Sequence, residues 1–105
     1  MKIPKRIKVG HQRLKIVVRD VVKARNGEEI LGMTLTSVSV IEIGRTYHGK
    51  VCPEDSLADT IFHEIIHSVN SIYGIGLTER QVIGLSGGLL AVIRDNKLDF
   101  SDRGK

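Results

Sequence analysis

The chain contains little of several residue types that mark whole classes of protein. Its 105 residues include a single cysteine, Cys52, and no tryptophan. One thiol cannot form an internal disulfide, and such sparse cysteine is typical of proteins in a reducing compartment, so we expect a cytoplasmic location. With 41% hydrophobic residues, the composition indicates an ordinary globular domain rather than a disordered or collagen-like chain.

Long hydrophobic runs are also absent. No stretch approaches the ~20 apolar residues that a membrane-spanning helix needs, so we expect no membrane partner. Residues 1–6 are rich in charge and no apolar segment follows them, which argues against a secretory signal. The length predicts one small domain over residues 1–105, with the polar stretch 97–105 as a frayed tail.

Positive charge is concentrated near the start of the chain. The net charge is +4, and most of the excess lies between Lys2 and Arg25. These basic residues are spread along strand-like segments without interleaved aromatic residues, which favours solvated outer faces of strands. We therefore do not expect a nucleic-acid partner, although a basic regulatory nucleic-acid-binding protein stays open as an alternative function.

The first half of the chain has the pattern of short strands. An Asn-Gly pair typical of hairpin turns separates the second apolar segment from the third. Alternating or β-branched apolar residues predict strands at Ile3–Val9, Leu14–Val22, Ile30–Leu35 and Val38–Ile43.

The second half begins with a predicted helix that ends at Gly74. Its start has two interpretations. Either Pro53 occupies the first turn, or Ser56 and Asp59 form a capping box.

A further helix is predicted from the capping-box pair Thr78 and Gln81 to about Asn96. Three glycines lower its intrinsic helix propensity, and we expect them to allow close packing on the first helix; they are Gly84, Gly87 and Gly88. The elements together predict an α+β fold, in which a small, mainly antiparallel N-terminal sheet of three or four strands precedes the two helices.

The first predicted helix carries the sequence His63-Glu64-Ile65-Ile66-His67, an HExxH motif. Positions i and i+4 of a helix lie on one face, so His63 and His67 can direct their imidazoles at one metal ion, with Glu64 at the edge of that face. Catalytic zinc sites use such imidazole ligands and keep a separate carboxylate beside the metal-bound water. The alternative is a chance pair of surface histidines.

The rest of this helix is consistent with such a site. Its polar residues share the side of the histidines, and a wide apolar stripe lies opposite them, so the histidines should face away from the core. Asp59 and Asn70 lie one turn before His63 and one turn after His67. Both are candidates for hydrogen bonding to the metal ligands, with exposed helix surface as the alternative.

A catalytic zinc site needs a third protein ligand, and few residues after His67 can supply it. No histidine follows, and the remaining acids are Glu79, Asp95, Asp99 and Asp102. The last two lie in the tail, and Asp95 is one long helix away from Glu79, so both cannot reach one ion. Glu79 is favoured because the short link before it can return the second helix to the histidines. The alternative is an ordinary first-turn glutamate that stabilises its own helix.

The HEIIH motif and the glutamate of the following LTERQV segment resemble the gluzincin group of zinc metallopeptidases. Residues 60–96 are also similar to small single-domain metallopeptidase-like proteins of bacteriophages and prophages. This resemblance implies a minimal zincin-like domain that binds one zinc ion through His63, His67 and Glu79, with Glu64 as the catalytic base. The chain lacks the NExxSD motif and the second subdomain of larger gluzincins.

The implied function is hydrolysis of peptide bonds in a peptide or protein substrate by zinc-activated water, with Glu64 as general base. Since extended substrates often pair with the strand that precedes such a helix, we expect substrate backbone along Val38, Val40, Ile41 and Ile43. An alternative is a phage-type metal-binding or interaction module with weak or no catalysis. The intact Glu64 argues against it, because a purely structural metal site needs no base.

Overall fold

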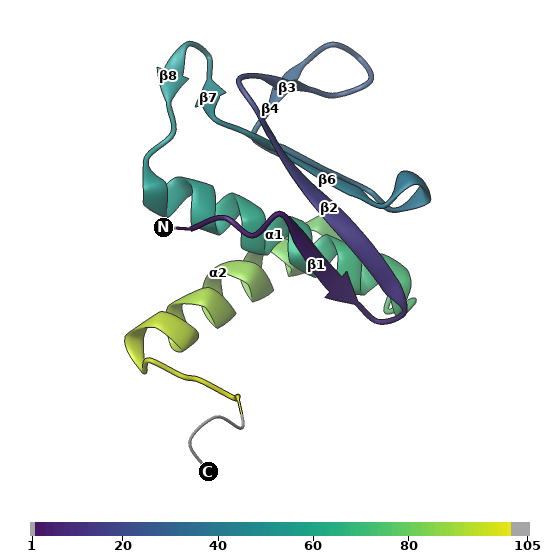
Figure 1. Cartoon of the computed structure of the whole chain (residues 1–105), viewed down its shortest axis with the longest axis vertical. Coiled ribbons are helices and arrows are strands. Elements are labelled where there is room, and N and C mark those ends of the chain that lie inside the picture. Colours follow the sequence, from purple (N-terminus) through teal and green to yellow (C-terminus); the bar gives the residue numbers. More distant parts are fainter. Residues whose placement is uncertain (1, 102–105) are drawn as a thin grey trace.

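The computed structural model describes residues 2–101, and its fold is α+β as predicted. A sheet built from the first half of the chain lies on α1, and α2 packs on α1 from another side (Figure 1). The strands are β1 (Arg6–Val9), β2 (Gln12–Arg19), β3 (Val22–Lys23), β4 (Glu29–Ile30), β5 (Gly32–Leu35), β6 (Val40–Gly44), β7 (Thr46–Tyr47) and β8 (Lys50–Val51); the helices are the short 3-10 turn η1 (Thr36–Val38), α1 (Glu54–Ile72) and α2 (Glu79–Asp95).

The main sheet has four strands in the order β1-β2-β6-β5. The pairs β1/β2 and β5/β6 are antiparallel, whereas the central pair β2/β6 is parallel, so the sheet is mixed rather than wholly antiparallel. The parallel pair requires a crossover, and β3, β4 and β5 make it. Two small antiparallel pairs, β3/β4 and β7/β8, stand apart from this sheet.

The core lies between the central strands and α1. Alternate side chains of β2 and β6 point to this side, because successive residues of a strand face opposite ways. Leu14, Ile41 and Ile43 are fully buried there, and they pack with Leu57 and Ile61 of α1. This apolar seam fixes one side of α1 against the sheet and leaves the polar side of the helix free for a site.

The two helices begin differently. Pro53 occupies the N-cap of α1, one residue before the first turn, and no side chain caps this end. Ser56 and Asp59 therefore do not form the alternative capping box. The capping box of α2 is confirmed, since the Gln81 N–H donates to the Thr78 hydroxyl at 3.2 Å and the Thr78 N–H donates to the Gln81 side chain at 2.9 Å.

The predicted substrate strand, Val38–Ile43, has no free edge to pair with a substrate, for a topological reason. β6 pairs with β2 on one side and with β5 on the other, so Val40, Ile41 and Ile43 have no free strand edge to offer. Val38 belongs to η1 rather than to a strand. Among the described strands of the main sheet, the edge strand on this side is β5.

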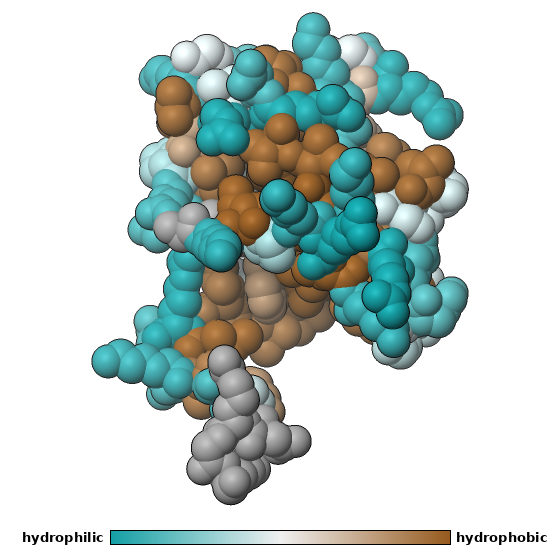
Figure 2. Space-filling model, in the orientation of Figure 1, coloured by the Kyte–Doolittle hydropathy of each residue, from teal (hydrophilic) through white to brown (hydrophobic). Residues whose placement is uncertain are grey.

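The glycines of α2 do not serve close helix packing, contrary to the expectation. A Cβ atom built on Gly84, Gly87 or Gly88 would meet no atom within 4 Å. Val82 and Ser86 are the buried residues of α2, and Figure 2 shows hydrophobic surface over this helix. Its exposed apolar side chains include Ile83, Leu85, Leu89 and Val92.

The end of the chain is described as far as Ser101, with no helix or strand after Asp95. Residues 102–105 of the predicted tail lie outside the described residues. None of the helices in residues 2–101 is both long and apolar enough to cross a membrane.

We predict that Gly84→Ala and Gly88→Ala each stabilise the protein by about 0.5–1 kcal/mol, because alanine restricts the unfolded chain and its methyl group has room in the helix. The midpoint of urea unfolding measures the change. Gly32→Ala is the contrasting variant, since its Cβ would lie 2.8 Å from the Thr60 methyl carbon, and it should destabilise the protein. A destabilised Gly84→Ala would mean that this glycine does pack closely.

Candidate metal centre

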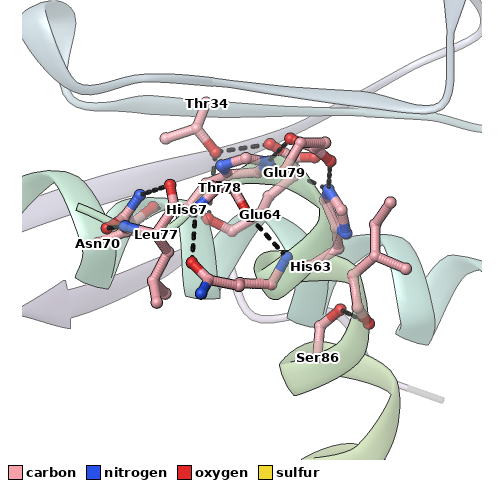
Figure 3. A network of polar contacts seen from close by, with 12 residues as sticks. Thr34, His63, Glu64, His67, Asn70, Leu77, Thr78, Glu79 and Ser86 are labelled. Carbon is pink, nitrogen blue, oxygen red and sulfur yellow. Dashed lines mark hydrogen bonds and ion pairs between the residues drawn. The ribbon is translucent and has the colours of Figure 1, made fainter. Parts of the chain in front are cut away.

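Three predicted ligands meet at one point between α1 and α2. The Nε2 atoms of His63 and His67 lie 3.1 Å apart, and each lies 2.9 Å from one carboxylate oxygen of Glu79 (Figure 3). One helical turn separates the two histidines, and Glu79 is the first residue of the next helix. His63, His67 and Glu79 are the group that can hold a metal ion within the described part of the chain.

The donor atoms fit a divalent transition metal. Two imidazole nitrogens and a carboxylate are borderline ligands of the kind that zinc sites use. A tetrahedral site with bonds of about 2.0–2.2 Å places neighbouring ligand atoms roughly 3.3–3.6 Å apart. The two nitrogens are 3.1 Å apart, and each is 2.9 Å from a Glu79 oxygen, Oε1 for His63 and Oε2 for His67; these spacings lie a few tenths of an ångström below that value.

The ligands are accessible, as an exchangeable fourth position requires. The side chains of His63 and His67 are 23% and 29% exposed, and that of Glu79 is 60% exposed. A structural site closed by four protein ligands would instead be shielded from solvent. This group can therefore hold an ion and still leave room for water or a substrate oxygen.

Glu64 is near the ligands but does not belong to their triangle. It is buried, with 5% of its surface exposed. One carboxylate oxygen accepts a hydrogen bond of 2.7 Å from the Thr34 hydroxyl of β5, so the side chain is directed at the edge strand (Figure 3). Within the HExxH motif, the two histidines therefore contact Glu79 of α2, whereas the Glu64 carboxylate contacts Thr34 of β5.

Two surface hollows meet at His63 and Glu64. The first, of about 430 Å³, contains all three ligands and has polar walls that include Thr34 and Asn70. The second, of about 400 Å³, has apolar walls between α1 and α2 that include Leu31 and Ile83. Gly32 of β5 borders both, so the edge strand runs past the whole site.

Asn70 has a different role from the one expected. Within residues 2–101 its side chain makes no hydrogen bond with His67; it makes two with the backbone of Leu77. The Leu77 N–H donates to Asn70 Oδ1 at 2.8 Å, and Asn70 Nδ2 donates to the Leu77 carbonyl at 3.3 Å. Leu77 lies two residues before Glu79, so Asn70 fixes the link that brings the third ligand to the histidines (Figure 3).

Asp59, the other candidate partner of the ligands, makes no hydrogen bond or ion pair with His63 in residues 2–101. Its side chain is exposed and lines the apolar hollow. Sequence reasoning missed Thr34 and Gly32 altogether. They lie about 30 residues before Glu64, and nothing in their own segment marks them, because only the sheet order brings β5 to the site.

We predict that His63→Ala, His67→Ala and Glu79→Ala each abolish tight binding of Zn²⁺, because two ligands cannot complete the set. Titration of metal-free protein by calorimetry measures the affinity. Glu64→Gln is the control: it alters a carboxylate outside the triangle and should bind the ion as wild type does. Equal loss in Glu64→Gln would place Glu64 among the ligands.

Asn70→Ala should lower Zn²⁺ affinity by ~10–100-fold, the usual cost of losing a group that orients a ligand. The fold should persist, because the substitution leaves the core seam intact. Asn96→Ala is the matched control, since that side chain donates to the Val92 carbonyl at the far end of α2. Unchanged affinity in Asn70→Ala would show that the link holds Glu79 without this contact.

Comparison with protein-family models, with curated proteins and with solved structures finds no match for this chain. The resemblance of the HEIIH motif and Glu79 to gluzincins, and that of residues 60–96 to small phage and prophage metallopeptidase-like proteins, therefore stay predictions. The features of the chain that point to a function are the cluster of His63, His67 and Glu79 and the Glu64 carboxylate beside it.

Proposed function

We propose that the protein is a zinc-dependent peptidase. The observation that carries this proposal is the pairing of a three-ligand triangle with a buried carboxylate outside it. A site that only stores or structurally uses a metal has no need for Glu64, whereas hydrolysis needs a base that is not a ligand. The choice of zinc follows from the ligand types.

A zinc ion bound at His63, His67 and Glu79 would supply Lewis acidity and a water molecule that is acidic near neutral pH. Glu64 would accept the proton of that water through the carboxylate oxygen not bonded to Thr34, and would then deliver it to the leaving amine of the substrate. The burial of Glu64 keeps bulk water from competing for the carboxylate.

The edge strand β5 is the natural place for substrate backbone. An edge strand has unpaired N–H and C=O groups, and an extended peptide can add to them as a further strand. β5 runs past both hollows, so a peptide paired with it would cross the polar hollow that contains the ligands. This position replaces the interior strand β6 that the sequence predicted.

A substrate side chain would enter the apolar hollow beside His63. Its walls include Leu31 and Ile83, and Gly87 leaves space because it has no side chain.

We predict that Gly87→Val lowers kcat/KM for peptides with a large apolar residue next to the cleaved bond and spares peptides with alanine there. Gly84→Val is the matched control, because it lies on the same helix outside the hollow. A parallel loss in both variants would contradict a specificity role for Gly87.

The decisive experiment combines metal content with cleavage of a peptide library. Purified wild type should contain about one zinc per chain and cut peptides, and Glu64→Gln should keep the zinc and lose at least ~10²-fold in rate. Zinc binding without any cleavage would favour the metal-binding interaction module. Failure to bind zinc at all would refute the proposal.

A further inference from the structure

We propose that Thr34 is a positioning residue for the Glu64 carboxylate. This inference rests on the proposed peptidase function, because it concerns how the base is aimed. Thr34 lies on the edge strand β5, whereas Glu64 lies in the middle of α1, and 30 residues separate them in the chain. Their contact joins the strand that would bind substrate to the group that would move the proton.

The Thr34 hydroxyl has two acceptors within reach on the same residue. Its oxygen lies 2.7 Å from Glu64 Oε1 and 3.1 Å from the Glu64 backbone carbonyl. A hydroxyl has one proton to donate. The carboxylate oxygen is the closer of the two acceptors, so the proton of Thr34 goes to Oε1.

This hydrogen bond distinguishes the two carboxylate oxygens of Glu64. Oε1 is occupied by Thr34, and a hydrogen bond to an ionised carboxylate is roughly twice as strong as a neutral one. Oε2 is left for the proton of the attacking water. In residues 2–101 the Glu64 carboxylate makes no ion pair, so Thr34 is the contact that sets its rotation.

The sheet holds Thr34 firmly at this place. Thr34 is paired with Ile41 and Gly32 with Ile43, two fully buried residues, so Gly32 and Thr34 both face α1. Gly32 allows the close approach, because a Cβ there would lie 2.8 Å from the Thr60 methyl carbon and 3.3 Å from Glu64 Cγ. The strand thus restricts the Glu64 side chain at two points. Gly32 lies close to Cγ, and Thr34 donates a hydrogen bond to Oε1.

Removing the hydroxyl should slow turnover and leave binding intact. Thr34→Val keeps the shape of the side chain but leaves Glu64 free to rotate, and a small misplacement of a reacting group can cost ~10²-fold in rate. We expect kcat to fall ~10–100-fold, with KM and Zn²⁺ affinity within about twofold of wild type. Thr34→Ser restores the hydroxyl and should restore kcat.

Steady-state cleavage of one peptide by wild type, Thr34→Val and Thr34→Ser tests the inference, with Zn²⁺ titration of each. Thr46→Val is the matched control, because that hydroxyl donates to the Asp20 carbonyl outside the site. Wild-type kcat in Thr34→Val, or a Thr34→Ser variant as slow as Thr34→Val, would overturn the positioning role.

A second measurement separates failure of this inference from failure of the proposed function. If wild type cuts no peptide, the peptidase proposal fails. A double-mutant cycle of Thr34→Val with Glu64→Ala, measured by urea unfolding, then tests whether the two side chains interact. Coupling between the two substitutions supports the hydrogen bond that fixes Glu64. Strictly additive shifts in the unfolding midpoint would overturn it.

Discussion

The site depends on one constraint: a carboxylate oxygen from α2 must reach two imidazole nitrogens that α1 already holds one turn apart. Nothing in α1 alone enforces this. The link between the helices does so, because Gly74 and Gly76 adopt positive φ values of 62° and 83° that let the chain reverse within a few residues. Asn70 then accepts a hydrogen bond from the Leu77 N–H, and Thr78 caps the first turn of α2. Each contact is local, and together they place Glu79 within 2.9 Å of both histidines.

A metal ion bound by these three residues would lie at the positive end of a helix. The first backbone N–H groups of α2 carry partial positive charge, which disfavours a bound metal ion. Glu79 is the first residue of that helix, so its carboxylate is stabilised by the dipole and supplies a negative charge at the same end. The Thr78 hydroxyl also accepts one of the free N–H groups, from Gln81. The carboxylate and the cap therefore offset the charge that would oppose binding.

The three residues that can hold a metal ion could be predicted from sequence because local geometry brings them together. Helical spacing places His63 with His67, and the shortage of acids after them leaves Glu79. The strand at the site could not be predicted, because it depends on the parallel pairing of β2 with β6 between distant segments, which puts β6 inside the sheet and β5 at its edge. Propensity shows that a segment is a strand, but not which strands flank it. The expectation that the α2 glycines allow close helix packing failed for a related reason. A small residue permits close packing, but it does not show that a neighbouring segment lies there.

The adjacent residues His63 and Glu64 contact two different elements that pack on α1. Successive residues on a helix point about 100° apart, so the two side chains diverge from α1. His63 turns to Glu79 on α2, whereas Glu64 turns to Thr34 on β5. The α1–α2 packing therefore controls the position of the ligands, and the α1–β5 packing controls the position of the carboxylate. Because these are separate interfaces, the spacing of the three residues that can hold a metal ion and the orientation of the Glu64 carboxylate can vary independently, although the motif that carries both is only five residues long.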